Sequence, residues 1–230
     1  MKTSGLVVGL AALFAAGSAP ASVVFDNITG VTAGGVLSLA TGNFGTPFGD
    51  SFSTGGSTIL NSVAVSLADV SNTDGGSISM YLVPDVGGVP SSTGRVLTNN
   101  TLLGTILDSS LGSTASIQTL STSIALTAGR YWIELVNSSD TANGGSGISS
   151  AASWAFNNDG AGVGTVGEFY SFTNDTNSGI TSASDATGPF RMIVTASSTP
   201  VPEPATTALV GAALAVMCLV RHRQRGLSSL

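Results

Sequence analysis

The sequence predicts an all-β protein: an antiparallel β-sandwich of the jelly-roll type, flanked by an N-terminal signal peptide and a C-terminal transmembrane helix. Residues 22–198 alternate apolar and polar side chains with a period of two, as half-buried strands do. Turn-forming clusters such as NTDGG, DVGGVP, TAGR and NNDG separate these runs. No stretch of about 12 residues in this body repeats with the 3.6-residue period of a helix. A barrel is the alternative architecture.

The first 21 residues have the parts of a secretory signal peptide. Lys2 gives a positive start, and an apolar stretch runs from Leu6 to Ala16. Ala19 and Ala21, with a proline between them, fit a small-x-small cleavage site. We therefore expect signal peptidase to cut after Ala21, so that residues 22–198 form an extracellular domain. An uncleaved membrane anchor is the alternative.

Four runs of the body show the alternation most clearly. Each places a set of apolar side chains on one face: Ile59, Val63, Val65 and Leu67; Ile78, Met80 and Leu82; Tyr131, Ile133 and Leu135; Phe190, Met192 and Val194. Further strands are expected at residues 23–27, 118–126, 153–156 and 169–172. In the third run, Trp132, Glu134 and Val136 share the opposite face, and the pattern leaves open which face is buried.

Charge and composition exclude several classes of function. Between residues 22 and 200, Arg95, Arg130 and Arg191 stand against twelve acidic residues, a formal charge of −9. Nucleic acid binding needs cations that displace counterions from phosphates, so we expect no nucleic acid partner. The single cysteine and the single histidine, Cys218 and His222, lie in the C-terminal tail. The body therefore has no disulfide, no thiolate metal cluster and no Ser-His-Asp triad.

The C-terminal segment, residues 199–230, has three parts in a fixed order. Val201, Pro202, Glu203 and Pro204 form a short proline-rich motif, residues 205–220 carry no charge, and Arg221, Arg223 and Arg225 follow. A helix of the 16 uncharged residues is about 24 Å long, slightly shorter than a bilayer core of about 30 Å. We expect it to span the membrane, with the basic tail of residues 221–225 on the cytoplasmic side.

This tripartite tail resembles the PEP-CTERM sorting signal of Gram-negative bacteria that make exopolysaccharide or biofilm matrix. The resemblance implies recognition by an exosortase, a membrane-embedded cysteine transpeptidase that cleaves near the Pro-Glu-Pro motif. Pro202 and Pro204 fix φ and remove two amide donors, which keeps the segment before the helix extended and accessible. A plain single-pass anchor is the alternative.

The body resembles the choice-of-anchor domains, type R in particular, which are extracellular β-domains found ahead of interchangeable C-terminal anchors. The similar segments are VVFDNITG, LNSVAVSLA, GSISMYLVPDVGGVPSS, LTAGRYWIELVNSS and SWAFN. The family has no defined molecular activity, so the resemblance implies a fold and a location only.

Aromatic side chains are the candidates for ligand contacts. Trp132, Trp154 and Tyr170 would stack on sugar rings if they were exposed, whereas strand aromatics more often lie in the core. Asp69 with Asp74, and Asp159 beside two asparagines, offer oxygen ligands for calcium, but the spacing favours turns. We expect no metal and no cofactor.

The sequence predicts a protein that is exported, held in the membrane by its C-terminal helix before processing, and then delivered to the cell surface or extracellular matrix. Its expected role is structural or adhesive, its processing partners are signal peptidase and an exosortase, and exopolysaccharide is a further candidate partner. A carbohydrate-binding module is the second hypothesis. A secreted hydrolase, using acids such as Glu134 and Glu168, is the third, and we do not expect an enzyme.

Overall fold

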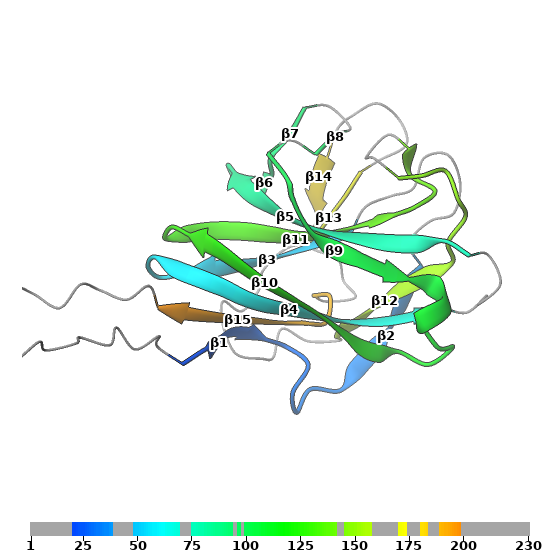
Figure 1. Ribbon diagram of the computed structural model, residues 1–230, viewed down its shortest axis with the longest axis horizontal. Helices are drawn as coiled ribbons and strands as arrows, with labels where there is room; N and C mark the ends of the chain where they lie inside the picture. The colour runs from blue at the N-terminus through cyan, green and yellow to red at the C-terminus, as the bar shows by residue number, and fades with distance from the viewer. Residues whose placement is uncertain are drawn as a thin grey trace, which may run out of the picture. The chain divides into compact units, whose positions relative to one another are not determined.

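The strands of this protein form two antiparallel sheets that pack face to face as a sandwich (Figure 1). The computed structural model describes residues 20–38, 48–69, 75–93, 96–97, 99–141, 145–157, 170–173, 180–183 and 189–198. They belong to one compact unit, Ser18–Thr199. Most of the predicted signal peptide and the whole C-terminal segment from residue 199 lie outside the described residues.

Sheet A contains the first and last described strands, and sheet B contains the strand that carries Trp132. Sheet A consists of β1 (Ser22–Asp26), β2 (Ala33–Ser38), β4 (Thr58–Asp69), β10 (Ser116–Leu126), β12 (Ala152–Asn157) and β15 (Met192–Ser198). Sheet B consists of β3 (Phe48–Thr54), β5 (Ser77–Val86), β6 (Val89–Pro90), β9 (Thr101–Leu107), β11 (Gly129–Asn137), β13 (Tyr170–Thr173) and β14 (Ile180–Ala183). A short pair, β7 (Ser92–Thr93) with β8 (Val96–Leu97), and a 3-10 turn at Asp108–Ser110 complete the described elements.

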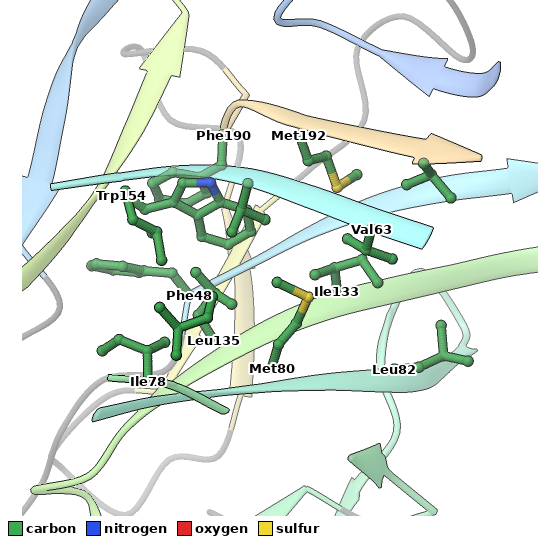
Figure 2. Packing of buried hydrophobic residues seen from close by; sticks show 14 of the residues in the cluster. Phe48, Val63, Ile78, Met80, Leu82, Ile133, Leu135, Trp154, Phe190 and Met192 are labelled. Carbon is green, nitrogen blue, oxygen red and sulfur yellow. The ribbon is translucent and has the colours of Figure 1, made fainter. Parts of the chain in front are cut away.

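The core lies between the two sheets and uses the faces that the alternation predicts. Ile78, Met80 and Leu82 from β5 meet Val63 and Met192 from the other sheet (Figure 2). Each large apolar side chain that is fully buried contributes about 1.5–3 kcal/mol relative to an exposed one, so this shared core is the main source of stability. The alternation in β11 and β15 is confirmed in the same way, since their inward residues are buried in this cluster.

One predicted face is wrong at its first residue. Leu60, and not Ile59, joins the core beside Val63. The physical reason is a β-bulge at Asn61: β15 pairs Thr195 with Ser62 and then Ala196 with Leu60, so the ladder skips one residue of β4. A bulge reverses the alternation, and a period-two count across it assigns the wrong face.

The four further strands predicted from the sequence are confirmed within two residues as β1, β10, β12 and β13. The helical transmembrane segment predicted at residues 205–220 lies outside the described residues. Within the part of the chain that the structure describes, no helix is both long enough and apolar enough to cross a bilayer.

Candidate functional site on the outer face of sheet B

The outer face of sheet B, which points away from sheet A, carries an unusual group of side chains. Alternation in β11 places Trp132, Glu134 and Val136 on this face, because Ile133 and Leu135 point into the core. The ladders then place Val83 beside Trp132 and Tyr81 beside Glu134. We call Tyr81, Val83, Asp85, Trp132, Glu134 and Val136 the Trp132 group.

Trp132 is held by a carboxylate at the end of β5. Its indole Nε1 donates a hydrogen bond to Asp85 Oδ1 at 2.8 Å, and the backbone amide of Gly88 donates to Asp85 Oδ2 at 3.1 Å. Gly87 and Gly88 have φ of +68° and +92°, which the turn between β5 and β6 requires and which glycine adopts without strain. Asp85 therefore ties the tryptophan to this turn.

Glu134 lies over a position that has no side chain. Its carboxylate occupies the space that a Cβ at Gly49, its register partner on β3, would enter. Glu134 is 1% exposed and Trp132 is 0% exposed. At these two residues, a face that points away from the sandwich core is thus itself closed to solvent.

The two ends of sheet B approach each other on this face. β14 and β6 stand at opposite ends of its strand order, yet they contact each other. Figure 1 shows β6 and β14 on the side of β5 and β11 that faces away from β4 and β15. The sheet therefore curls over its outer face, and Trp132 with Val83 and Val136 forms a second, smaller core there.

A second polar cluster fixes the turn after β1. Asp26 Oδ1 accepts hydrogen bonds from the amides of Ile28 and Thr29 at 2.8 and 2.9 Å. Arg191 donates from its two terminal nitrogens to the carbonyls of Ile28 and Val31, each at 3.0 Å. Burial raises the pKa of Asp26. The hydrogen bonds from Thr29 and Ile28 and the charge of Arg191 together lower it by more than burial raises it, so the pKa lies below its ordinary value.

Comparisons with known proteins give a distant likeness in structure alone. No protein-family model matches the chain, and no curated protein does. The chain is similar to a solved structure of the cysteine protease and lectin-like domains of Cwp84, a surface layer associated protein of Clostridium difficile, with a TM-score of 0.44 and 17% identity over 67% of this chain and 32% of that chain. It is similar to the clostridial cysteine protease Cwp84 after propeptide cleavage, with a TM-score of 0.46 and 17% identity over 70% of this chain and 37% of that chain. The chain thus spans about a third of the length of these structures.

The structure separates the three aromatic residues proposed for sugar contacts. Trp132 lies in the covered outer face of sheet B. Trp154 lies in the main core, 0% exposed, with its ring stacked on Phe190 at 4.6 Å and its Nε1 donating to the carbonyl of Arg191 at 2.9 Å. Trp154 therefore presents no surface to a ligand, because its ring fills the space between the sheets. Tyr170 begins β13 and pairs with Asp50 of β3, and the structure describes its backbone but not its side chain.

The predicted processing residues lie at or beyond the ends of the described sandwich. Ala21 is exposed and directly precedes β1, whereas Ala19, the motif at residues 201–204 and the tail at 221–225 lie outside the described residues. Among the residues that the structure does describe, no group of three or more histidine, cysteine or acidic side chains is arranged to hold a metal ion.

The sequence did not reveal Asp85 and Arg191 as organising residues. Alternation places Tyr81, Val83 and Asp85 on one face of β5, but it gives no register between β5 and β11. Only the ladder that pairs Trp132 with Val83 brings the indole within reach of Asp85. Arg191 is the one charged residue in the apolar run PFRMIVTAS. A single charge in such a run is a weak sign that the side chain is half-buried and has a structural role.

Proposed function

We propose that this chain is an exported structural or adhesive protein of the cell surface or exopolysaccharide matrix of a Gram-negative bacterium, sorted by an exosortase through residues 199–230. The observation that carries the proposal is the position of the two ends of the sandwich. β1 begins at Ser22 and β15 ends at Ser198, so cleavage after Ala21 and cleavage near Pro202 would both leave every described strand whole.

The pairing of β1 with β15 supports the same arrangement. The two strands are antiparallel, and Ser22 pairs with Ala196, so the chain enters and leaves the sandwich at one end. A C-terminal anchor would therefore hold the domain by this end, which we call the tether end. Asp69 of β4 pairs with Ala152 at the opposite end of the sandwich.

The strand order supports a jelly-roll assignment within the sandwich class. The first and last described strands are neighbours in sheet A, and the chain alternates between the two sheets from β3 to β4 to β5 and again from β9 to β10 to β11. Such crossing is typical of jelly rolls, which present their loops at the two ends of the sandwich. A domain of this kind, held at its tether end, keeps the loops of its other end free for contacts.

Substitution of the motif tests the sorting proposal. We expect Glu203→Ala to leave the protein in the membrane fraction of its native host, with at least a tenfold loss of released protein, since the acid is the one charge in the motif. Thr199→Ala, two residues before the motif, is the matched control and should be released normally. Release of the Glu203→Ala protein at the wild-type level would remove the support for exosortase processing.

Carbohydrate binding is the second candidate, and the observation that favours it is the Trp132 group. An indole flanked by Asp85 and Glu134 has the chemistry of a sugar subsite, in which ring faces stack and carboxylates accept hydroxyl hydrogen bonds. Because Trp132 is closed to solvent, binding at this place requires the residues that cover the indole to move.

Glycan-array binding of the full chain tests this candidate. We expect Trp132→Phe, which keeps a ring but removes the Nε1 donor, to weaken glycan binding at least tenfold. Trp154→Phe changes a tryptophan in the main core and serves as the matched control. The candidate fails if no matrix polysaccharide binds, or if both variants bind as the wild type does.

A further inference from the structure

Two edge strands lie together on one flank of the sandwich. In the part of the chain that the structure describes, β10 pairs only with β4 and β9 pairs only with β5. Leu120 of β10 packs against the backbone of Gly104 on β9, where an added Cβ would lie 3.0 Å from Leu120 Cδ1. The outer edges of both sheets therefore open on the same side, and we call residues 101–107 and 116–126 the β9–β10 flank (Figure 1).

This flank lacks two features that commonly protect an edge strand, exposed charges and proline. Natural sheets protect their edges with lysine, proline, inward-pointing charges, β-bulges or a covering segment. Residues 101–126 contain no proline and one charged residue, Asp108, which is 1% exposed. Leu102, Leu107 and Ile117 of the same flank are each more than half exposed, at 53%, 59% and 53%. Such an edge is open to pairing with another strand.

The regular part of the edge is the first half of β10. Its ladder with β4 runs without interruption from Ser116 to Ser121, and the register shifts only between Ser121 and Ile124. Within the regular half, Ile117, Thr119 and Ser121 point outward and are exposed. A bulge twists an edge strand away from a partner, so an incoming strand would pair with residues 116–121.

We propose that the β9–β10 flank binds a second copy of this chain, through antiparallel pairing of β10 with β10 of the other copy about a two-fold axis at Thr119. A two-fold interface joins the same patch on both copies, so the patch must be self-complementary. With the axis at Thr119, one Thr119 faces the other and Ile117 faces Ser121. Hydroxyl pairs of this kind form cross-strand hydrogen bonds, and no like charges meet.

A second copy fits this edge because its outward residues are neutral as well as self-complementary. The whole chain has a formal charge of −6, so its copies repel each other at long range, and a joining surface that carried acids would add to that repulsion. The outward residues of β10 are uncharged along its full length. They hold no cation for an acidic polymer and no anion for a basic partner, so the backbone edge itself provides the affinity.

Disulfide trapping tests the pairing and its register. The experiment uses the full chain in detergent with Cys218→Ser, which removes the native thiol. Residues directly opposite in an antiparallel pair have Cα atoms about 4.5–5.5 Å apart, within disulfide range, so Thr119→Cys should give a covalent dimer under mild oxidation. Ser121→Cys is the matched control, because the two copies of that residue would lie about 14 Å apart.

We expect Thr119→Cys to form the covalent dimer at least tenfold faster than Ser121→Cys. Equal rates, no dimer in either variant, or faster dimerisation of Ser121→Cys would overturn the proposal. A cross-link from residue 119 to a different macromolecule would overturn it as well, since the flank would then serve another partner.

Sedimentation of the same full chain gives an independent readout. A lysine at position 119 places a charge at the two-fold axis, so Thr119→Lys should shift the sedimentation profile toward monomer. Thr32→Lys changes an exposed threonine outside the flank and should sediment as the wild type does. The proposal fails if Thr119→Lys and the wild type associate equally over the same concentration range.

Discussion

At the scale of single residues, Asp26 makes the stability of the fold depend on pH. Its carboxylate accepts the amides of Ile28 and Thr29 and faces Arg191, and its pKa is lowered in the folded state. A lowered pKa means that the folded protein holds the charged form better than the unfolded chain does. The contribution to stability is therefore present above the unfolded pKa of about 3.9 and is lost as the pH falls through the folded value.

We predict that Asp26→Asn lowers the free energy of unfolding by about 1 kcal/mol at pH 7, because the amide keeps the acceptor but loses the charge. The difference from wild type should begin to shrink as the pH falls below about 4, because the carboxyl of the unfolded wild-type chain then takes up a proton, and it should vanish only below the lowered pKa of folded Asp26. Urea unfolding of both proteins between pH 7 and pH 3 measures this. A difference that stays constant across that range would show that the charge of Asp26 is unimportant.

The Trp132 group shows how far single residues could be predicted. Alternation separated Trp132 from Ile133 and Leu135, and the structure confirms that they lie on opposite faces. The sequence could not show that Trp132, Glu134 and Val136 are buried as well, because burial of an outer sheet face depends on segments that pack over it and not on the strand's own pattern. Period-two patterns report the face of a residue and not what lies above it.

At the scale of elements, β3 is a strand that alternation missed, and it has polar and small residues in buried positions. β3, with the sequence FGDSFST, pairs with both β11 and β13 and is buried along most of its length. Glycine, aspartate and serine normally indicate turns, so the run has no strand signal. Gly49 is explained only by Glu134 above it, and Asp50 and Ser51 are joined by a hydrogen bond of 2.8 Å from the Ser51 amide to Asp50 Oδ1.

The loop between β11 and β12 gives an element-scale prediction. An added Cβ at Gly145 would lie 2.5, 2.7 and 2.8 Å from the carbonyl oxygens of Ser138, Asp140 and Asn137. These oxygens belong to the backbone and cannot move away without shifting the chain, so we expect Gly145→Ala to lower the free energy of unfolding by about 1–3 kcal/mol.

Gly55→Ala is the matched control for this prediction. No atom lies within 4 Å of a Cβ at that position, so the alanine should be neutral or stabilise by about 0.4–1 kcal/mol through the unfolded chain. Thermal unfolding of both variants measures the difference. Equal melting temperatures for Gly145→Ala and Gly55→Ala would mean that Gly145 does not lie against these carbonyl oxygens.

At the scale of the whole molecule, composition predicts the number of charges but not their placement. Six acidic residues of the described sandwich are buried, each at most 9% exposed: Asp26, Asp50, Asp69, Asp108, Glu134 and Asp140. The formal charge of −9 therefore overstates the charge on the described surface. The expectation that the protein has no nucleic acid partner then depends on the scarcity of cations rather than on a negative surface.

The fold class was predictable for a related reason. Two sheets with a shared core need strands with one apolar face, and that requirement leaves its pattern in the sequence. The pairing order leaves no such pattern, because it depends on contacts between distant segments such as β1 and β15. That pairing brings the two ends of the sandwich together and supports the proposal of a single tether.

Mass spectrometry of the protein isolated from its native host tests that proposal most directly, because it identifies both ends of the mature chain. We predict an N-terminus at Ser22 and a C-terminus within or next to Val201–Pro204, with residues 205–230 removed. A chain that retains its C-terminus at Leu230 in the surface or matrix fraction would contradict sorting by an exosortase.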